Sequence, residues 1–127
     1  AEDGIRDHCV TGVQTCALPI YQYGQPLNVN ADIVAGAIAG ALHADQMVFL
    51  TDVRGIYERW PDEESLISEI TAVELESMSF AAGMIPKVEA TLNAIRSGAK
   101  SVRIIDGTSE SAFTDALLGK GGTWVKP

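Results

Sequence analysis

The chain has 127 residues, of which 46% are hydrophobic, and it carries a formal net charge of −8 at pH 7. These values are typical of one globular domain with a buried core, and no apolar run approaches the roughly 18 residues that a membrane-spanning helix needs. The acidic balance argues against a nucleic-acid partner and an anionic membrane, which both attract clustered basic residues, but a small anionic ligand remains compatible with it.

The first twenty residues, AEDGIRDHCVTGVQTCALPI, show neither helical nor strand periodicity. They resemble the in-frame translation of a sequencing-library adapter, so we expect residues 1–20 to be a non-native segment and residues 21–127 to form the domain. The alternative is a genuine amino-terminal arm. Both cysteines, Cys9 and Cys16, lie in this segment. The domain therefore lacks a cysteine for a disulfide or zinc site, which suits a cytoplasmic protein.

Helical and strand patterns alternate along residues 21–127. The helices follow apolar repeats, a capping box that begins at Thr71, and Pro86 in a first turn, whereas the strands are short apolar runs. In chain order we predict a helix over 31–44, a strand over 47–51, a surface loop over 57–65, helices over 71–78 and 86–98, a strand over 102–105, a helix over 111–118 and a strand over 123–125. This alternation predicts an α/β fold with a mainly parallel open sheet flanked by helices.

Three polar side chains, Asn28, Asn30 and Asp32, occupy alternate positions around the start of the first predicted helix. In an extended segment they share one side and converge at the amino terminus of the helix. Asparagine can hydrogen-bond a carboxylate or amide ligand, and aspartate can hold a cation in place. Spacing alone leaves an equal alternative, in which Asp32 caps the helix and the asparagines complete a turn.

Lys87 lies in the first turn of the helix that follows Pro86. A cation there opposes the positive end of the helix dipole, which is explained if Lys87 and free backbone N–H groups share an anion. Gly83, just upstream, allows a ligand to approach the backbone closely. The alternative is a solvated surface lysine. The sequence contains no Walker A motif.

Thr51 and Asp52 follow a predicted strand, at the position where open α/β sheets bind ligands. His43 lies near a helix end and is better explained as a cap than as an acid–base group. The sequence shows no Ser-His-Asp or Cys-His arrangement and no metal-ligand cluster. An aspartate, a lysine and a helix amino terminus suit phosphoryl transfer, which depends on positioning and charge neutralisation rather than on a protein nucleophile.

Four motifs, in this order, resemble the acetylglutamate kinases of the amino-acid kinase superfamily: NVNAD at 28–32, LTDVRGI at 50–56, GMIPKVEA at 83–90 and IIDG at 104–107. The resemblance implies that residues 21–127 are the carboxyl-terminal, nucleotide-binding half of an amino-acid kinase domain, which is an αβα sandwich. It also implies a cytoplasmic enzyme of arginine biosynthesis. Such an enzyme uses ATP with Mg²⁺ to phosphorylate the side-chain carboxylate of N-acetyl-L-glutamate, and it is a homo-oligomer at full length.

The same resemblance implies a role for each matching residue. Asp32 and Lys87 would be catalytic, because the matching aspartate orients two catalytic lysines of which Lys87 is one. Asn28 and Asn30 would bind the substrate. The nucleotide site would be lined by Thr51, Asp52, Gly55, Gly83 and Met84.

The sequence departs from the family pattern in two places. The amino-terminal half, with its glycine-rich phosphate loops and second lysine, has no counterpart here, so we expect this chain to be inactive alone. A glutamate that contributes to feedback binding of arginine is missing near Ala116, which argues against arginine inhibition. The alternatives are another amino-acid kinase, of aminoadipate, aspartate or carbamate type, or a nucleotide-binding module without catalysis. Asn30-Ala31 argues against the aminoadipate type, which tends towards Asp-Gly.

Overall fold

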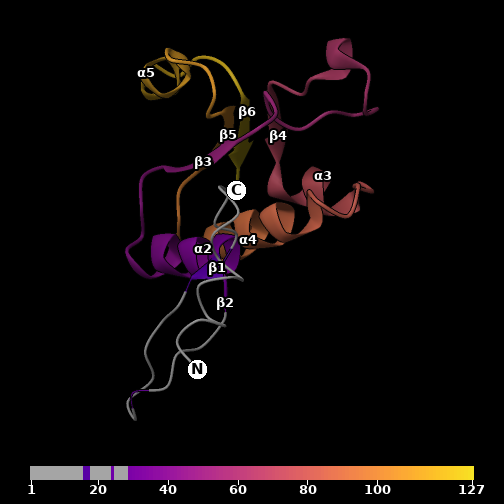
Figure 1. Cartoon of the computed structure of the whole chain (residues 1–127). Coiled ribbons are helices and arrows are strands. Elements are labelled where there is room, and N and C mark those ends of the chain that lie inside the picture. Colours follow the sequence, from indigo (N-terminus) through magenta and orange to yellow (C-terminus); the bar gives the residue numbers. More distant parts are fainter. Residues whose placement is uncertain (1–15, 18–23, 25–28) are drawn as a thin grey trace.

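The computed structural model describes residues 16–17, 24 and 29–127 (Figure 1). Most of the expected non-native segment, its boundary at residue 21, and Asn28 lie outside the described residues. None of the helices in the described part of the chain is long and apolar enough to cross a membrane.

Helices and strands alternate as the sequence predicts. Their bounds are β1 (Cys16–Ala17), β2 (Val29–Asn30), α2 (Ala31–Ala41), β3 (Met47–Thr51), a 3-10 turn η1 (Glu63–Ser65), β4 (Glu69–Thr71), α3 (Ala72–Ser77), α4 (Ile85–Arg96), β5 (Val102–Asp106), α5 (Ala112–Leu117) and β6 (Thr123–Lys126). The short strands β1, β2 and β4 and the turn η1 were not predicted.

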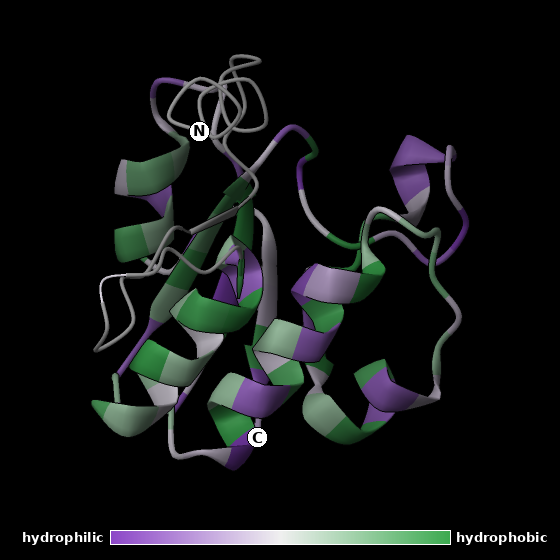
Figure 2. Cartoon of the chain, turned by 60° about the horizontal axis from the view of Figure 1, so that its bottom comes forward, coloured by the Kyte–Doolittle hydropathy of each residue, from purple (hydrophilic) through white to green (hydrophobic). Residues whose placement is uncertain are grey.

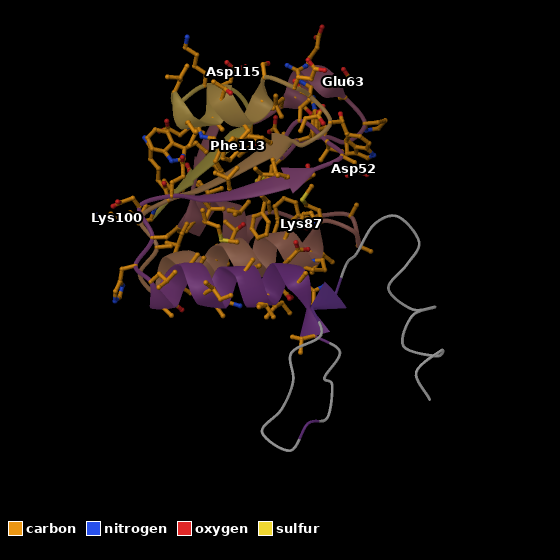
Figure 3. The ribbon with its side chains drawn as sticks, turned by 60° about the vertical axis from the view of Figure 1, so that its left-hand side comes forward. Asp52, Glu63, Lys87, Lys100, Phe113 and Asp115 are labelled. Carbon is orange, nitrogen blue, oxygen red and sulfur yellow. The ribbon has the colours of Figure 1, made fainter. Side chains whose placement is uncertain are left out.

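The main sheet has the strand order β3-β5-β6-β4. The pairs β3–β5 and β4–β6 are parallel, while β5 and β6 run antiparallel. The short strands β1 and β2 form a separate antiparallel ladder. Figure 3 shows α5 on one side of the main sheet and the pair α2 and α4 on the other. The expected α/β class, with an open sheet between layers of helices, is confirmed.

Helix α2 ends three residues earlier than predicted because of His43. Leu42 is the carboxyl-terminal cap, and His43 then takes the left-handed conformation, with φ of 48° and its N–H donating to the carbonyl of Gly40. The imidazole of His43 packs against Gly98, where an added Cβ would overlap the ring. The cap expected at His43 is therefore Leu42, and His43 is the left-handed residue directly after it.

Helices α2 and α4 pack together through small residues. A Cβ atom at Gly36 would lie 2.5 Å from the carbonyl oxygen of Ala90, and one at Gly40 would overlap Ser97. Figure 2 shows that α2 is largely hydrophobic, and its one acidic residue, Asp32, lies in the first turn. The two helix backbones therefore lie as close as glycine allows, which fixes their relative position.

The core lies between this helix pair and the sheet. Its fully buried members, each at most 1% exposed, include residues from the turn after β3, from α3 and α4, and from β5 and β6. They are Ile56, Leu75, Ala90, Ala94, Val102, Ile104 and Val125.

The predicted capping box at the start of α3 is present. Thr71 Oγ1 accepts from the N–H of Glu74 at 3.2 Å, and the Glu74 carboxylate accepts from the N–H of Thr71 at 2.9 Å. The backbone and side-chain hydrogen bonds from Thr71 lower the pKa of Glu74. The charged form of Glu74 is therefore preferred in the folded chain.

Replacing Glu74 by glutamine is expected to make stability less dependent on pH. A carboxyl group whose pKa is lowered by folding stabilises the fold above its unfolded pKa, and this contribution is lost as the pH falls through the folded pKa. Glutamine still accepts in a capping box, so the variant removes only the charge. Urea unfolding at about pH 7 and about pH 3 measures the free energy of unfolding of the wild type and of the variant. The excess of the wild-type value over that of the variant should shrink at the lower pH. A difference in free energy of unfolding that is equal at both pH values would contradict this prediction.

Candidate functional site

The site lies at the edge of the sheet where the parallel strands β3 and β5 end. Thr51 is the last residue of β3, and its buried hydroxyl donates to the carbonyl of Val53 at 2.7 Å and accepts from the N–H of Val53 at 3.1 Å. The carbonyl of Thr51 also accepts from the N–H of Gly107, just after β5. These bonds shape the turn that follows β3 and present Asp52 at this edge.

A pocket of about 340 Å³ opens between this turn and the start of α4. Four of the five residues predicted for the nucleotide site line it, namely Thr51, Asp52, Gly83 and Met84, and so does Lys87. The fifth, Gly55, does not line the pocket. A Cβ at Gly55 would lie 2.5 Å from Thr123 Oγ1, so this glycine allows the turn to pack against β6.

Asp32 and Lys87, which are 55 positions apart, meet at the edge of this pocket. Lys87 Nζ donates to Asp32 Oδ2 at 3.0 Å, and both side chains are about one quarter exposed. Asp32 comes from the first turn of α2, and Lys87 comes from the first turn of α4. Figure 3 shows Lys87 between the helix layer and the sheet. The structure therefore brings together the two side chains for which the sequence predicts catalytic roles.

Asn30, and not Asp32, is the amino-terminal cap of α2. Its Oδ1 accepts from the N–H groups of Asp32 at 2.9 Å and of Ile33 at 3.2 Å. The alternative in which Asp32 caps the helix is wrong, and the carboxylate of Asp32 pairs with Lys87 instead. The side-chain oxygen of Asn30 is engaged in the cap, so its substrate-binding role stays a prediction, as does that of Asn28.

The start of α4 has the features of an anion site. Its cap residue, Met84, makes no side-chain capping bond, its first turn contains no acidic residue, and Pro86 lies at one of its first two positions. No described atom lies within 4 Å of a Cβ built at Gly83, so a ligand has open access to the backbone there. The N–H groups of Met84 and Lys87 already donate to chain carbonyls, so Lys87 Nζ is the main donor that this turn offers to an anion.

A second acidic side chain, Asp106, lies at the end of β5. Its carboxylate accepts from the hydroxyl of Thr108 at 2.6 Å and from the N–H of Thr108 at 2.9 Å, and these bonds, with a smaller effect of Arg54, lower the pKa of Asp106. Among the described residues, no group of three or more His, Cys, Asp and Glu side chains is arranged to hold a metal ion.

Sequence reasoning missed the aromatic wall of the pocket, which consists of Tyr57, Trp60 and Phe80. Trp60 lies in a segment that reads as a surface loop because residues 57–65 contain one proline and four acidic residues. An aromatic residue as large as tryptophan in such a polar loop was the available signal, because tryptophan is usually well buried.

Comparison with known proteins places these features in a family. The family model described as the amino acid kinase family matches residues 8–106. The chain is 46% identical over 108 residues to the acetylglutamate kinase of Corynebacterium glutamicum, a match that covers 82% of this chain and 37% of that protein. It is 52% identical over 107 residues to the acetylglutamate kinase of Beutenbergia cavernae, covering 81% of this chain and 34% of that protein. The chain thus spans about a third of the length of the curated relatives it matches.

Solved structures agree on the fold. The carbamate kinase from Giardia lamblia bound to AMP-PNP superposes with a TM-score of 0.66 at 26% identity, over 91% of this chain and 42% of that one. The N-acetylglutamate synthase from Neisseria gonorrhoeae, complexed with coenzyme A and N-acetyl-glutamate, gives a TM-score of 0.78 at 24% identity, over 87% of this chain and 26% of that one. From the extent of the family match and the similarity of fold, the chain belongs to the amino acid kinase family.

Proposed function

We propose that this chain is the nucleotide-binding portion of an acetylglutamate kinase, which transfers the γ-phosphoryl group of ATP to the side-chain carboxylate of N-acetyl-L-glutamate. The observation that carries the proposal is the Asp32–Lys87 contact beside a pocket at the carboxyl ends of parallel strands. The identity of 46–52% to acetylglutamate kinases supports N-acetyl-L-glutamate as the acceptor.

The proposed reaction needs no protein nucleophile. A carboxylate oxygen of the acceptor forms the new bond to the γ-phosphorus while the bond from that phosphorus to the departing ADP breaks. Negative charge is spread over the oxygens of the transferred group, and Lys87 Nζ neutralises part of it. Asp32 positions Lys87 through the 3.0 Å contact.

The residues of the pocket fit ATP. Lys87 provides a cation for the phosphates, and apolar and aromatic side chains of the same pocket provide a wall for a flat base. Mg²⁺ would accompany ATP and neutralise phosphate charge, held by the phosphate oxygens. We assign no described residue to the metal ion.

The remaining features of the proposal follow the family resemblance. The complete enzyme would be a cytoplasmic homo-oligomer in arginine biosynthesis, and residues 21–127 would be its carboxyl-terminal portion, about a third of its length. The family match begins at residue 8, so the domain boundary at residue 21 also stays a proposal.

A chimeric enzyme tests the function. The matched stretch of the Corynebacterium glutamicum acetylglutamate kinase is replaced by the corresponding residues of this chain, and phosphoryl transfer from ATP is measured with N-acetylglutamate, N-acetylaminoadipate, aspartate and carbamate. We expect transfer to N-acetylglutamate in clear preference to the other acceptors. Preference for another acceptor would contradict the acceptor assignment. ATP binding by a folded chimera without transfer to any of the four would favour a non-catalytic module.

A further inference from the structure

The outer wall of the pocket ends in an exposed aromatic side chain. Trp60 lines the pocket, yet 61% of its surface is exposed. Tyr57 packs against it edge to face, with the ring centroids 5.2 Å apart and an angle of 67° between the planes. Tyr57 is partly buried, and Phe80 is partly buried against the core. Of the three aromatic residues, Trp60 therefore has the most ring surface left for a ligand.

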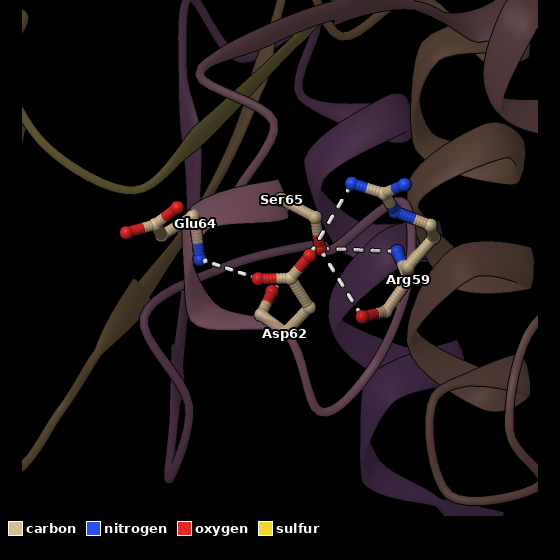
Figure 4. Close-up of polar contacts among 4 residues, drawn as sticks. All are labelled: Arg59, Asp62, Glu64 and Ser65. Atoms are coloured by element: carbon tan, nitrogen blue, oxygen red, sulfur yellow. Dashed lines mark hydrogen bonds and ion pairs between the residues drawn. The ribbon is translucent and has the colours of Figure 1, made fainter.

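The loop that carries Trp60 is held by its own hydrogen bonds (Figure 4). Arg59 pairs with the carboxylate of Asp62 at 3.3 Å, and that carboxylate also accepts from the N–H of Glu64 at 3.1 Å. The hydroxyl of Ser65 accepts from the N–H of Arg59 at 3.1 Å and donates to the carbonyl of Asp62 at 2.6 Å. These bonds fix the backbone on both sides of Trp60, so its ring is presented at the pocket by an ordered loop.

A preorganised aromatic face beside a cationic group suits a ligand with a flat ring and an anionic tail. Base-to-aromatic stacking is tolerant of base identity because every base has a π face, and it loses little entropy when the protein ring is already positioned. We propose that Trp60 is the base-stacking residue of this pocket, with Tyr57 supporting its ring. This inference rests on the proposed nucleotide site and assigns it a binding residue that lies outside the four motifs of the sequence.

Calorimetric titration of the 127-residue chain with ATP tests the inference. Trp60→Leu keeps an apolar side chain but removes the ring, whereas Trp60→Phe keeps a ring. We expect Trp60→Leu to weaken ATP binding by roughly 5- to 100-fold and Trp60→Phe to recover most of the loss. Phe113→Ala is the matched control, because Phe113 is an aromatic residue of α5 that is 51% exposed and does not line the pocket. Its ATP affinity should equal that of the wild type.

Fluorescence gives a second readout, because the chain contains only two tryptophans, Trp60 and Trp124. ATP should quench the emission of the wild type and leave that of Trp60→Phe, which reports Trp124 alone, unchanged. Equal ATP affinity for the wild type and Trp60→Leu would overturn the inference and leave the proposed function intact. Absence of ATP binding to the wild-type chain would overturn both.

Discussion

Replacing Lys87 by alanine in the chimeric enzyme is expected to lower the rate of phosphoryl transfer by roughly 100- to 1000-fold, the usual cost of removing one preorganised donor to a developing charge. Lys87 Nζ is the described cation that lines the pocket, and Asp32 holds it there at 3.0 Å. Without it, the charge on the transferred group would lose one of its proposed neutralising partners. Steady-state kinetics with saturating ATP measures the change in kcat.

The matched control for this prediction is Lys100→Ala. Lys100 also pairs with an aspartate, Asp45, but its side chain is 70% exposed and lies outside the pocket. Ion pairs of this exposed kind contribute little to stability or function, so the rate should stay within about twofold of the unsubstituted chimera. A Lys87→Ala rate as high as that of Lys100→Ala would remove Lys87 from the proposed mechanism.

Replacing Gly36 by alanine is expected to destabilise the chain by about 2 kcal/mol and to lower its melting temperature by roughly 8–16 °C. In an unobstructed helix the same substitution stabilises by about 1 kcal/mol, because alanine is the better helix former. Here the added Cβ would lie 2.5 Å from the carbonyl oxygen of Ala90, which belongs to the backbone of α4. The two helices must then separate, and the buried contacts between them weaken.

Gly83→Ala is the matched control for the helix crossing. No described atom lies within 4 Å of a Cβ at Gly83, so its unfolding free energy should change by less than about 0.5 kcal/mol. Urea denaturation of both variants measures the difference. A Gly36→Ala variant that is as stable as the wild type would show that the crossing of α2 and α4 is loosely packed.

Patterns of neighbouring residues in the sequence predicted the helices and strands whose positions depend on nearby residues alone. The apolar run of β3, the capping box at Thr71 and Pro86 at the start of α4 each appear at the predicted place. Strand β4 was missed because its three residues contain only one buried apolar side chain, Ile70, and it is a strand because it pairs with β6. The antiparallel pairing of β5 with β6 is also a property of distant residues that no local pattern encodes.

In the candidate site, too, some features could be predicted from neighbouring residues and others depend on contacts between distant residues. The position of Lys87 in a first turn indicated an anion, but its contact with Asp32 depends on how α2 crosses α4. Without the family resemblance, spacing left Asp32 equally well explained as a helix cap. The structure resolves this ambiguity because Asn30 makes the capping bonds. Trp60 in a polar loop was a signal in the sequence, but the pocket that it lines forms only where the turn after β3 meets the start of α4.

The glycine contacts between α2 and α4 also determine how the site responds to change. Gly36 lies one turn after Asp32, and its neighbour Ala90 lies almost one turn after Lys87. The starting points of the two charged side chains are therefore fixed by two helix backbones that cross at Gly36 with no side chain between them. A substitution that widens the crossing moves Lys87 away from Asp32 while both residues remain present. Reduced phosphoryl transfer by a chimera that carries such a variant would then be explained by this wider spacing, at a position outside the pocket.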